Sequence, residues 1–218
     1  MKWMRDLVLA QLQRPHGWPA PVMGRILDRV NRRLNAQVID MLAPRPDERH
    51  LEIGFGGGVG LSLLRARCPQ VRLAGAEIST AMLSGARRRF RRALAAQTLE
   101  LREAGVERLP WPDDAFHGVY TVNTIYFWTD AMAGLREILR VLRPAGRLIL
   151  GVRAQATLQR AGFADRGFLT PSYDDIATWL GRAGFRRMRM LEDRRRAMAT
   201  IFAERPHGAT LPASELAR

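Results

Sequence analysis

LEIGFGGGVG (residues 51–60) holds five glycines in ten positions, directly behind a short apolar run. Glycine loses more conformational freedom on folding than any other residue, so such a cluster indicates a use for bare backbone. The candidate uses are close approach of a dinucleotide, of a nucleoside triphosphate or of another compact ligand, and a tight turn that binds nothing.

Segments typical of strands and helices alternate from this loop onward. The alternation predicts right-handed βαβ units and therefore a Rossmann-like, doubly wound α/β fold, with a mostly parallel seven-stranded sheet covered by helices on both faces. The expected strands are residues 48–54, 71–77, 99–105, 117–123 and 147–153, and the expected helices between them are residues 59–68, 79–97 and 130–143.

The last third of the chain changes this rhythm. Residues 172–184 carry a capping-box pattern, with Ser172 as the N-cap, Asp175 three positions later and Gly184 as the C-cap. Two strand-like segments, 185–193 and 197–205, follow with only RRR between them. So short a connection cannot contain a crossover helix, and we expect an antiparallel hairpin at one edge of the sheet.

The residues within the glycine loop distinguish between the candidate ligands. A Walker A loop requires Gly-Lys-Ser/Thr at its end, whereas Gly60 is followed by Leu61 and Ser62, which excludes an NTPase of that kind. The dinucleotide pattern that begins at Gly54 and Gly56 requires glycine at position 59, which is Val59.

Acidic residues mark the first two expected strands. Glu52 precedes the alternating glycines at 54, 56 and 58, and Glu77 ends the second strand. In an open α/β sheet, ligands bind beyond the carboxyl ends of the strands. We expect Glu52 to meet a cationic amine and Glu77 to accept both hydroxyls of a ribose, a pair of contacts that points to an aminoacyl nucleoside.

Four stretches, in order and at characteristic spacings, carry a resemblance to a known family. They are LEIGFGGGVG, AGAEISTAML (74–83), VERLPWPDDAFHGVYTVNTIYFW (106–128) and LREILRVLRPAGRLIL (135–150). With these, residues 48–205 resemble the class I S-adenosylmethionine-dependent methyltransferases, especially the type-11-like group that acts on small molecules and lipids.

The resemblance implies S-adenosyl-L-methionine as the cofactor, with S-adenosyl-L-homocysteine as its product, and no metal ion. Glu52 would lie near the amino group of the cofactor and Glu77 would hold the ribose hydroxyls. The other implied cofactor-binding residues are Gly54, Phe55, Gly56 and Gly58 along the methionine portion, Ile78 and Met82 against the adenine, Val106 through its backbone to the adenine, and Asn123 and Thr124 closing the site through their backbone.

Two positions depart from the family's pattern. Gly105 precedes Val106 where the family commonly has Asp, so the side-chain contact to the exocyclic amine is either missing or supplied by Glu103 or Glu107. His117 stands where the family often has Asp at the start of the fourth strand, and we expect it to brace a loop.

Methyl transfer from a sulfonium is an in-line displacement in which the cofactor carries the activated group. The protein therefore aligns the acceptor and excludes water, and it needs a general base only if the acceptor must lose a proton. Tyr126 is the catalytic candidate, either to orient or to deprotonate the acceptor. His16 is a second candidate base, provided that its loop folds over the site.

The aromatic residues after the fourth strand predict a small acceptor of apolar or aromatic, or lipid-like, character. Phe127, Trp128 and Trp111 would line its pocket, with a core position as the alternative for Trp111. Asn31 and Asn35 are further candidates for acceptor contacts, with solvated helix positions as the alternative.

The expected organisation is an N-terminal helical lid or cap (1–47), the methyltransferase domain (48–205) and a flexible tail (206–218). Trp3, Leu7 and Trp18 among basic residues leave a peripheral membrane contact as the alternative to a lid. No apolar stretch is long enough to span a membrane, Arg5 and Asp6 interrupt any signal peptide, and the expected location is the cytoplasm.

The formal net charge of +14 raises the question of a nucleic-acid partner. Nearly all of this charge is arginine, and Lys2 is the only lysine, which favours a coding bias over a phosphate-binding surface. Nucleic acid is therefore not the expected partner. The alternatives that remain are a nucleic-acid or protein methyltransferase that uses the basic surface, a cofactor-binding module without catalysis, and a nicotinamide oxidoreductase.

Overall fold

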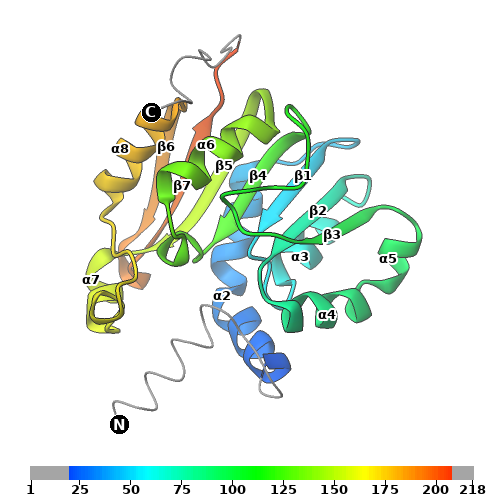
Figure 1. The fold of residues 1–218 in the computed structure, drawn as a ribbon, viewed down its shortest axis with the longest axis horizontal. Helices are drawn as coiled ribbons and strands as arrows, with labels where there is room; N and C mark the ends of the chain where they lie inside the picture. The colour runs from blue at the N-terminus through cyan, green and yellow to red at the C-terminus, as the bar shows by residue number, and fades with distance from the viewer. Residues whose placement is uncertain (1–19, 208–218) are drawn as a thin grey trace.

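A computed structural model describes residues 20–207, which form one sheet with helices on both faces (Figure 1). The strand order is β3-β2-β1-β4-β5-β7-β6, which confirms the predicted seven-stranded α/β fold. The strands are β1 (Arg49–Ile53), β2 (Arg72–Glu77), β3 (Leu99–Glu103), β4 (Phe116–Val122), β5 (Leu142–Arg153), β6 (Arg186–Asp193) and β7 (Met198–Glu204).

Strands β1 to β5 pair in parallel, whereas β7 is antiparallel to both β5 and β6. The predicted antiparallel hairpin is therefore present, and it places β6 at the edge and β7 inside the sheet. The helices are α2 (Ala20–Leu42), α3 (Val59–Arg67), α4 (Thr80–Arg89), α5 (Arg91–Ala95), α6 (Ala131–Val141), α7 (Gln155–Arg160) and α8 (Tyr173–Ala183), with 3₁₀ turns η1 (Ile125–Phe127), η2 (Ala164–Arg166) and η3 (Arg194–Arg196).

The central strands are buried on both faces, and each face has its own apolar cluster. Alternation along the strands divides the side chains: Val119 of β4 packs toward α6 and α8, and its neighbour Tyr120 packs toward α2 and α3. The half of α2 that ends at Leu42 lies in this second cluster, with Leu34 and Val38 buried.

The capping-box prediction for residues 172–184 is confirmed. The Asp175 amide donates to the Ser172 hydroxyl over 3.1 Å, and the Ser172 amide donates to the Asp175 carboxylate over 2.8 Å. Gly184 ends α8 with φ of 104°, in the left-handed region that favours glycine.

Two sequence predictions are wrong in detail. The helix expected over 79–97 is divided at Phe90 into α4 and α5, and the Phe90 ring packs against Gly58 of the glycine loop. The strand expected over 147–153 begins earlier, at Leu142, and contains an irregularity: β4 pairs first with Leu142 and then with Arg147, and Ala145 takes a φ of 59°.

Among residues 20–207, no helix has both the length and the apolar character that crossing a bilayer would require.

Candidate active site

A cavity of about 360 Å³ lies beyond the carboxyl ends of the central strands, in the size range of small-ligand pockets. Its wall contains nearly all of the predicted cofactor residues within the described part of the chain: Glu52, Gly54, Phe55, Gly56, Glu77, Ile78, Met82, Gly105, Val106, Glu107, Asn123 and Thr124. Gly58 is the exception, since it precedes α3 and packs against the Phe90 ring.

The glycine loop combines tight packing with one open face. Gly54 and Gly56 take φ values of 66° and 52°, which residues that carry a side chain rarely adopt. A Cβ atom at position 54 would lie 2.5 Å from the Cγ2 atom of Thr124, whereas a Cβ atom at position 56 would meet nothing within 4 Å. The Gly56 backbone therefore borders space that a ligand can fill.

Glu77 joins the glycine loop to the start of α4. One carboxylate oxygen accepts from the Gly56 amide and the other from the Ser79 amide, both over 2.9 Å. Burial raises the pKa of this carboxyl group, and the backbone donors partly oppose the rise. Each carboxylate oxygen can accept a further bond, so the group fits a pair of ribose hydroxyls.

Glu52 lies in a buried acidic corner under α3. Its carboxylate accepts from the Tyr120 hydroxyl over 3.0 Å, and burial together with this charge raises the pKa of Tyr120 well above its usual value. A Cβ atom at Gly60 would lie 2.3 Å from Glu52 Oε1 and 2.7 Å from Asn35 Oδ1, so two acceptors meet there. The Asn35 oxygen is buried and has no hydrogen-bond partner among the described residues. Such a corner suits a cationic donor.

Of the two acidic residues expected near Gly105, Glu107 is the one that lies on the cavity wall. A Cβ atom at Gly105 would lie 3.1 Å from Glu107 Oε2, and the other oxygen, Oε1, accepts from the Thr129 amide over 2.9 Å. Glu107 lines the cavity, whereas Glu103 lies outside its wall and accepts from the Thr80 hydroxyl over 3.2 Å.

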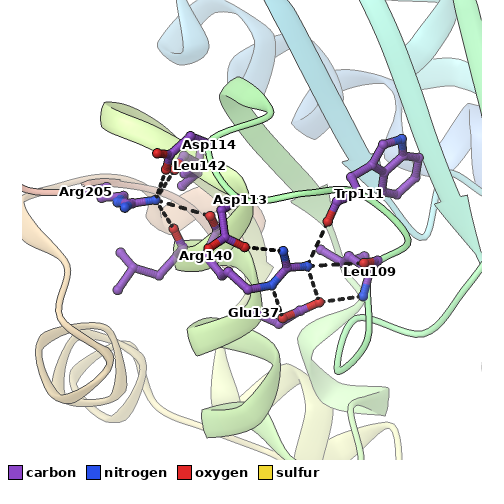
Figure 2. Close-up of polar contacts among 9 residues, drawn as sticks. Leu109, Trp111, Asp113, Asp114, Glu137, Arg140, Leu142 and Arg205 are labelled. Carbon is purple, nitrogen blue, oxygen red and sulfur yellow. Dashed lines mark hydrogen bonds and ion pairs between the residues drawn. The ribbon is translucent and has the colours of Figure 1, made fainter. Parts of the chain in front are cut away.

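A polar network on α6 holds the loop between β3 and β4, which carries Val106 and Glu107 (Figure 2). Arg140 donates to the carbonyl oxygens of Leu109 and Trp111 over 3.2 and 2.9 Å, and to Asp113 over 2.6 Å. Sequence reasoning missed this network, because it depends on how the loop folds back onto the helix.

Aromatic side chains form the part of the cavity wall that follows β4 and β5. Tyr126, Phe127 and Trp128 line it, as does Phe163, whose ring centroid lies 5.8 Å from that of Tyr126. The Tyr126 hydroxyl accepts from the Arg153 amide and donates to Asn123 Oδ1 over 3.4 Å, and burial raises its pKa.

Other predicted residues fall elsewhere. Trp111 takes the core alternative: it packs edge-on against Phe116, and its indole donates to Glu100 over 3.0 Å. His117 lies outside the cavity wall and accepts from the amide of Arg49, the first residue of β1, over 3.0 Å. His16 lies outside the described residues.

Four further residues lie on the cavity wall. The sequence leaves two alternative positions for Asn31 and Asn35, and it predicts no role for Arg153 and Thr157. Asn31 and Asn35 of α2 lie on the wall, and the side-chain amide of Asn123 donates to Asn31 Oδ1 over 2.9 Å. Arg153 and Thr157 lie on the wall at the end of β5 and on α7. The carboxyl-end rule for parallel strands is the signal that points to Arg153.

Comparisons with known proteins agree with this geometry. A family model described as a methyltransferase domain matches residues 51–150. The uncharacterized methyltransferase YdaC of Bacillus subtilis is 31% identical over 126 residues, which cover 58% of this chain and 67% of that protein. The demethylmenaquinone methyltransferase of Thermus thermophilus is 32% identical over 120 residues, covering 54% of this chain and 53% of that protein.

Solved structures show the same fold. The complex of the Haloferax volcanii Trm112 methyltransferase activator with a methyltransferase contains a chain that matches with a TM-score of 0.74 at 17% identity, over 87% of this chain and 96% of that one. The chain spans about half of the length of several curated relatives, the Thermus enzyme among them. The sequence match to YdaC, the family model and the fold together show that the chain belongs to the class I S-adenosylmethionine-dependent methyltransferases, of the type-11 kind.

Proposed function

We propose that this chain binds S-adenosylmethionine and moves its methyl group to an O, N or C atom of a small acceptor with an apolar or aromatic body. One observation carries the proposal: a single cavity is lined by Glu77 and the glycine loop, which end β2 and follow β1, and by the aromatic side chains of Tyr126, Phe127 and Phe163, which follow β4 and β5. We call these two parts of the wall the cofactor end and the acceptor end. A donor and an acceptor bound there would share one enclosed space.

Different wall residues would bind different parts of the cofactor. Glu77 would accept the ribose hydroxyls, and its bonds to the Gly56 and Ser79 amides keep the carboxylate in place. Glu52 and Asn35 would accept from the amino group of the methionine portion. Ile78, Met82 and Val106 supply the apolar surface against which an adenine would pack, with Val106 also offering its backbone.

The cofactor supplies an activated methyl group on sulfonium sulfur. The chain's own residues then align the acceptor and keep water out, for which the aromatic wall is suited. Because burial raises the pKa of Tyr126, its phenol stays protonated at neutral pH, and we assign it an orienting role. His16 remains the second candidate to accept a proton.

The acceptor class follows from the wall and from the relatives. Phe127, Trp128, Leu158 and Phe163 present an apolar surface, and the Thermus relative is named for an acceptor with a quinone-type ring. A lid or cap role for residues 1–47 belongs to the same proposal, since Asn31 and Asn35 already reach the cavity from α2.

Isothermal titration calorimetry with S-adenosylmethionine tests the cofactor assignment. Glu77→Ala removes charge-assisted hydrogen bonds, each worth about 1.5–3 kcal/mol, so the affinity should fall at least about 10-fold. Asp47→Asn, at an exposed carboxylate outside the cavity wall, is the control and should bind as the wild type does. Unchanged affinity of Glu77→Ala would contradict the ribose assignment.

The same preparation separates the alternatives. Preferential binding of NAD would indicate an oxidoreductase. Binding to DNA or RNA that weakens steeply with salt would favour a nucleic-acid substrate. Tight cofactor binding with no turnover of any aromatic acceptor in a panel would indicate a binding module.

A further inference from the structure

The acceptor end of the cavity carries an isolated positive charge. The chain has 35 Lys and Arg residues, yet Arg153 is the one basic residue on the cavity wall within the described part of the chain. The acidic wall residues Glu52, Glu77 and Glu107 all belong to the proposed cofactor end. Arg153 ends β5, beside the aromatic wall.

The guanidinium of Arg153 lies close enough to the wall to act on it. Its positive charge lowers the pKa of Tyr126 against the larger effect of burial, and it acts in the same direction on Tyr173. Among residues 20–207, no carboxylate forms an ion pair with it. Glu192, which also acts on Tyr173, pairs instead with Arg194 over 3.0 Å.

Thr157, four residues after Arg153 and on α7, adds an unsatisfied polar group. It lines the cavity from α7, and its buried hydroxyl oxygen has no hydrogen-bond partner among the described residues. A buried polar atom without a partner costs free energy, so native proteins seldom keep one that meets nothing. Leu158 and Phe163, which line the same cavity, are apolar.

We propose that the methyl acceptor carries a carboxylate, which Arg153 and Thr157 bind while its apolar body lies against Phe127 and Phe163. This inference rests on the proposed function and narrows its substrate class. A guanidinium matches a carboxylate with two parallel hydrogen bonds, and the Thr157 hydroxyl supplies a further donor.

Electrostatics favour the same acceptor. A cationic cofactor and Arg153 in one apolar cavity repel each other in a medium of low dielectric constant, and a carboxylate between them offsets both charges. Anchoring the acid at one end also fixes the direction in which the reacting atom of the acceptor points, which is the main contribution that the protein makes to the rate.

The test uses the full chain saturated with S-adenosylhomocysteine and matched pairs of aromatic probes. Calorimetry compares 4-hydroxybenzoate with 4-hydroxybenzamide, cinnamate with cinnamamide, and 2-naphthoate with 2-naphthamide. In the wild type we expect at least one acid to bind 10-fold or more tightly than its amide. Arg153→Met should abolish this preference, and Thr157→Val should reduce it several-fold.

Arg160→Met provides the matched control, because Arg160 lies on α7 with an exposed side chain outside the cavity wall, and it should keep the preference of the wild type. Equal binding of acid and amide in every pair, or a preference that survives Arg153→Met, would overturn the inference. Affinity for S-adenosylhomocysteine is measured on every variant. Its absence in the wild type would refute the proposed function itself, whereas its presence without any acid preference would refute only the carboxylate.

Discussion

Arg140 donates two hydrogen bonds to Glu137, from Nε to Oε2 over 2.8 Å and from Nη2 to Oε1 over 2.7 Å (Figure 2). Glu137 in turn accepts from the Leu109 amide over 2.7 Å. Hydrogen bonding to Glu137 raises the pKa of Arg140. Burial alone would raise the pKa of Glu137, but its bonds to Arg140 and Leu109 lower it. The pair thereby ties the loop between β3 and β4 to α6.

Arg140→Met should lower the free energy of unfolding by about 1–3 kcal/mol, because it leaves a partly buried carboxylate and two carbonyl oxygens without their donor. Urea denaturation measures the change. Arg136→Met is the control, since Arg136 is an exposed arginine on the same helix, and its effect should stay within about 0.5 kcal/mol. Equal stability of the two variants would contradict a bracing role.

Acid should destabilise the protein through Glu48, which pairs with Arg147 and lies 3.1 Å from the ring of His50. Burial alone would raise the pKa of Glu48, but the bonds to His50 and Arg45 and the charge of Arg147 lower it to about 2. A depressed carboxyl pKa stabilises the fold above the unfolded value of 4.5, and the contribution is lost as the pH falls toward 2.

Glu48→Gln should therefore be less stable than the wild type at pH 7, by about 1–2 kcal/mol once solvent screening of this partly exposed group is included, and the difference should shrink between pH 4.5 and 2. Urea midpoints across this range provide the measurement. Asp47→Asn, at an exposed neighbouring carboxylate, should show no such convergence. A stability difference between the wild type and Glu48→Gln that does not change with pH would contradict the lowered pKa of Glu48.

Two alanine substitutions in the glycine loop should have different effects, one mainly on stability and the other mainly on cofactor binding. Gly54→Ala collides with Thr124 and strains a left-handed backbone, so it should cost about 2–4 kcal/mol of stability. Gly56→Ala strains the backbone by about 1–2 kcal/mol, but its methyl group enters the cavity. It should remain folded while its affinity for S-adenosylmethionine falls at least 10-fold, and wild-type affinity in calorimetry would refute the placement of the ligand.

Tyr126→Phe should reduce kcat/KM less than about 10-fold and leave the shape of the pH profile unchanged, because a phenol whose pKa is raised by burial orients rather than deprotonates. Tyr173→Phe, outside the cavity wall, is the matched control. A loss of about 10²–10⁴-fold together with a vanished limb of the pH profile would instead identify Tyr126 as the base.

Features that depend on residues close together in the sequence could be predicted, and features that depend on residues far apart could not. Glu52, Gly54 and Glu77 belong to local patterns at strand ends, where the topology of a parallel sheet dictates their position, and all three line the cavity. The capping box at Ser172 depends on four consecutive residues and was equally readable.

Features that depend on distant partners were beyond sequence reasoning. The helix break at Phe90 accompanies packing of its ring on Gly58, 32 residues earlier in the chain, as the numbering shows. Trp111 is drawn into the core by Phe116 and Glu100, although its neighbours in sequence suggested the pocket. Asn35 reaches the cavity because α2 packs against β4, β5 and β7, and no pattern within α2 specifies these partners.

The position of β7 has a consequence for how the chain is made. The last strand in sequence lies between β5 and β6, so residues 147–153 of β5 have no antiparallel neighbour until residues 198–204 have been synthesised. A ribosome-bound chain that already contains every wall residue of the cavity still presents a bare, apolar strand edge, of the kind that recruits other chains. Until the last strand in the sequence pairs with β5, this edge is therefore open to pairing with strands of other chains.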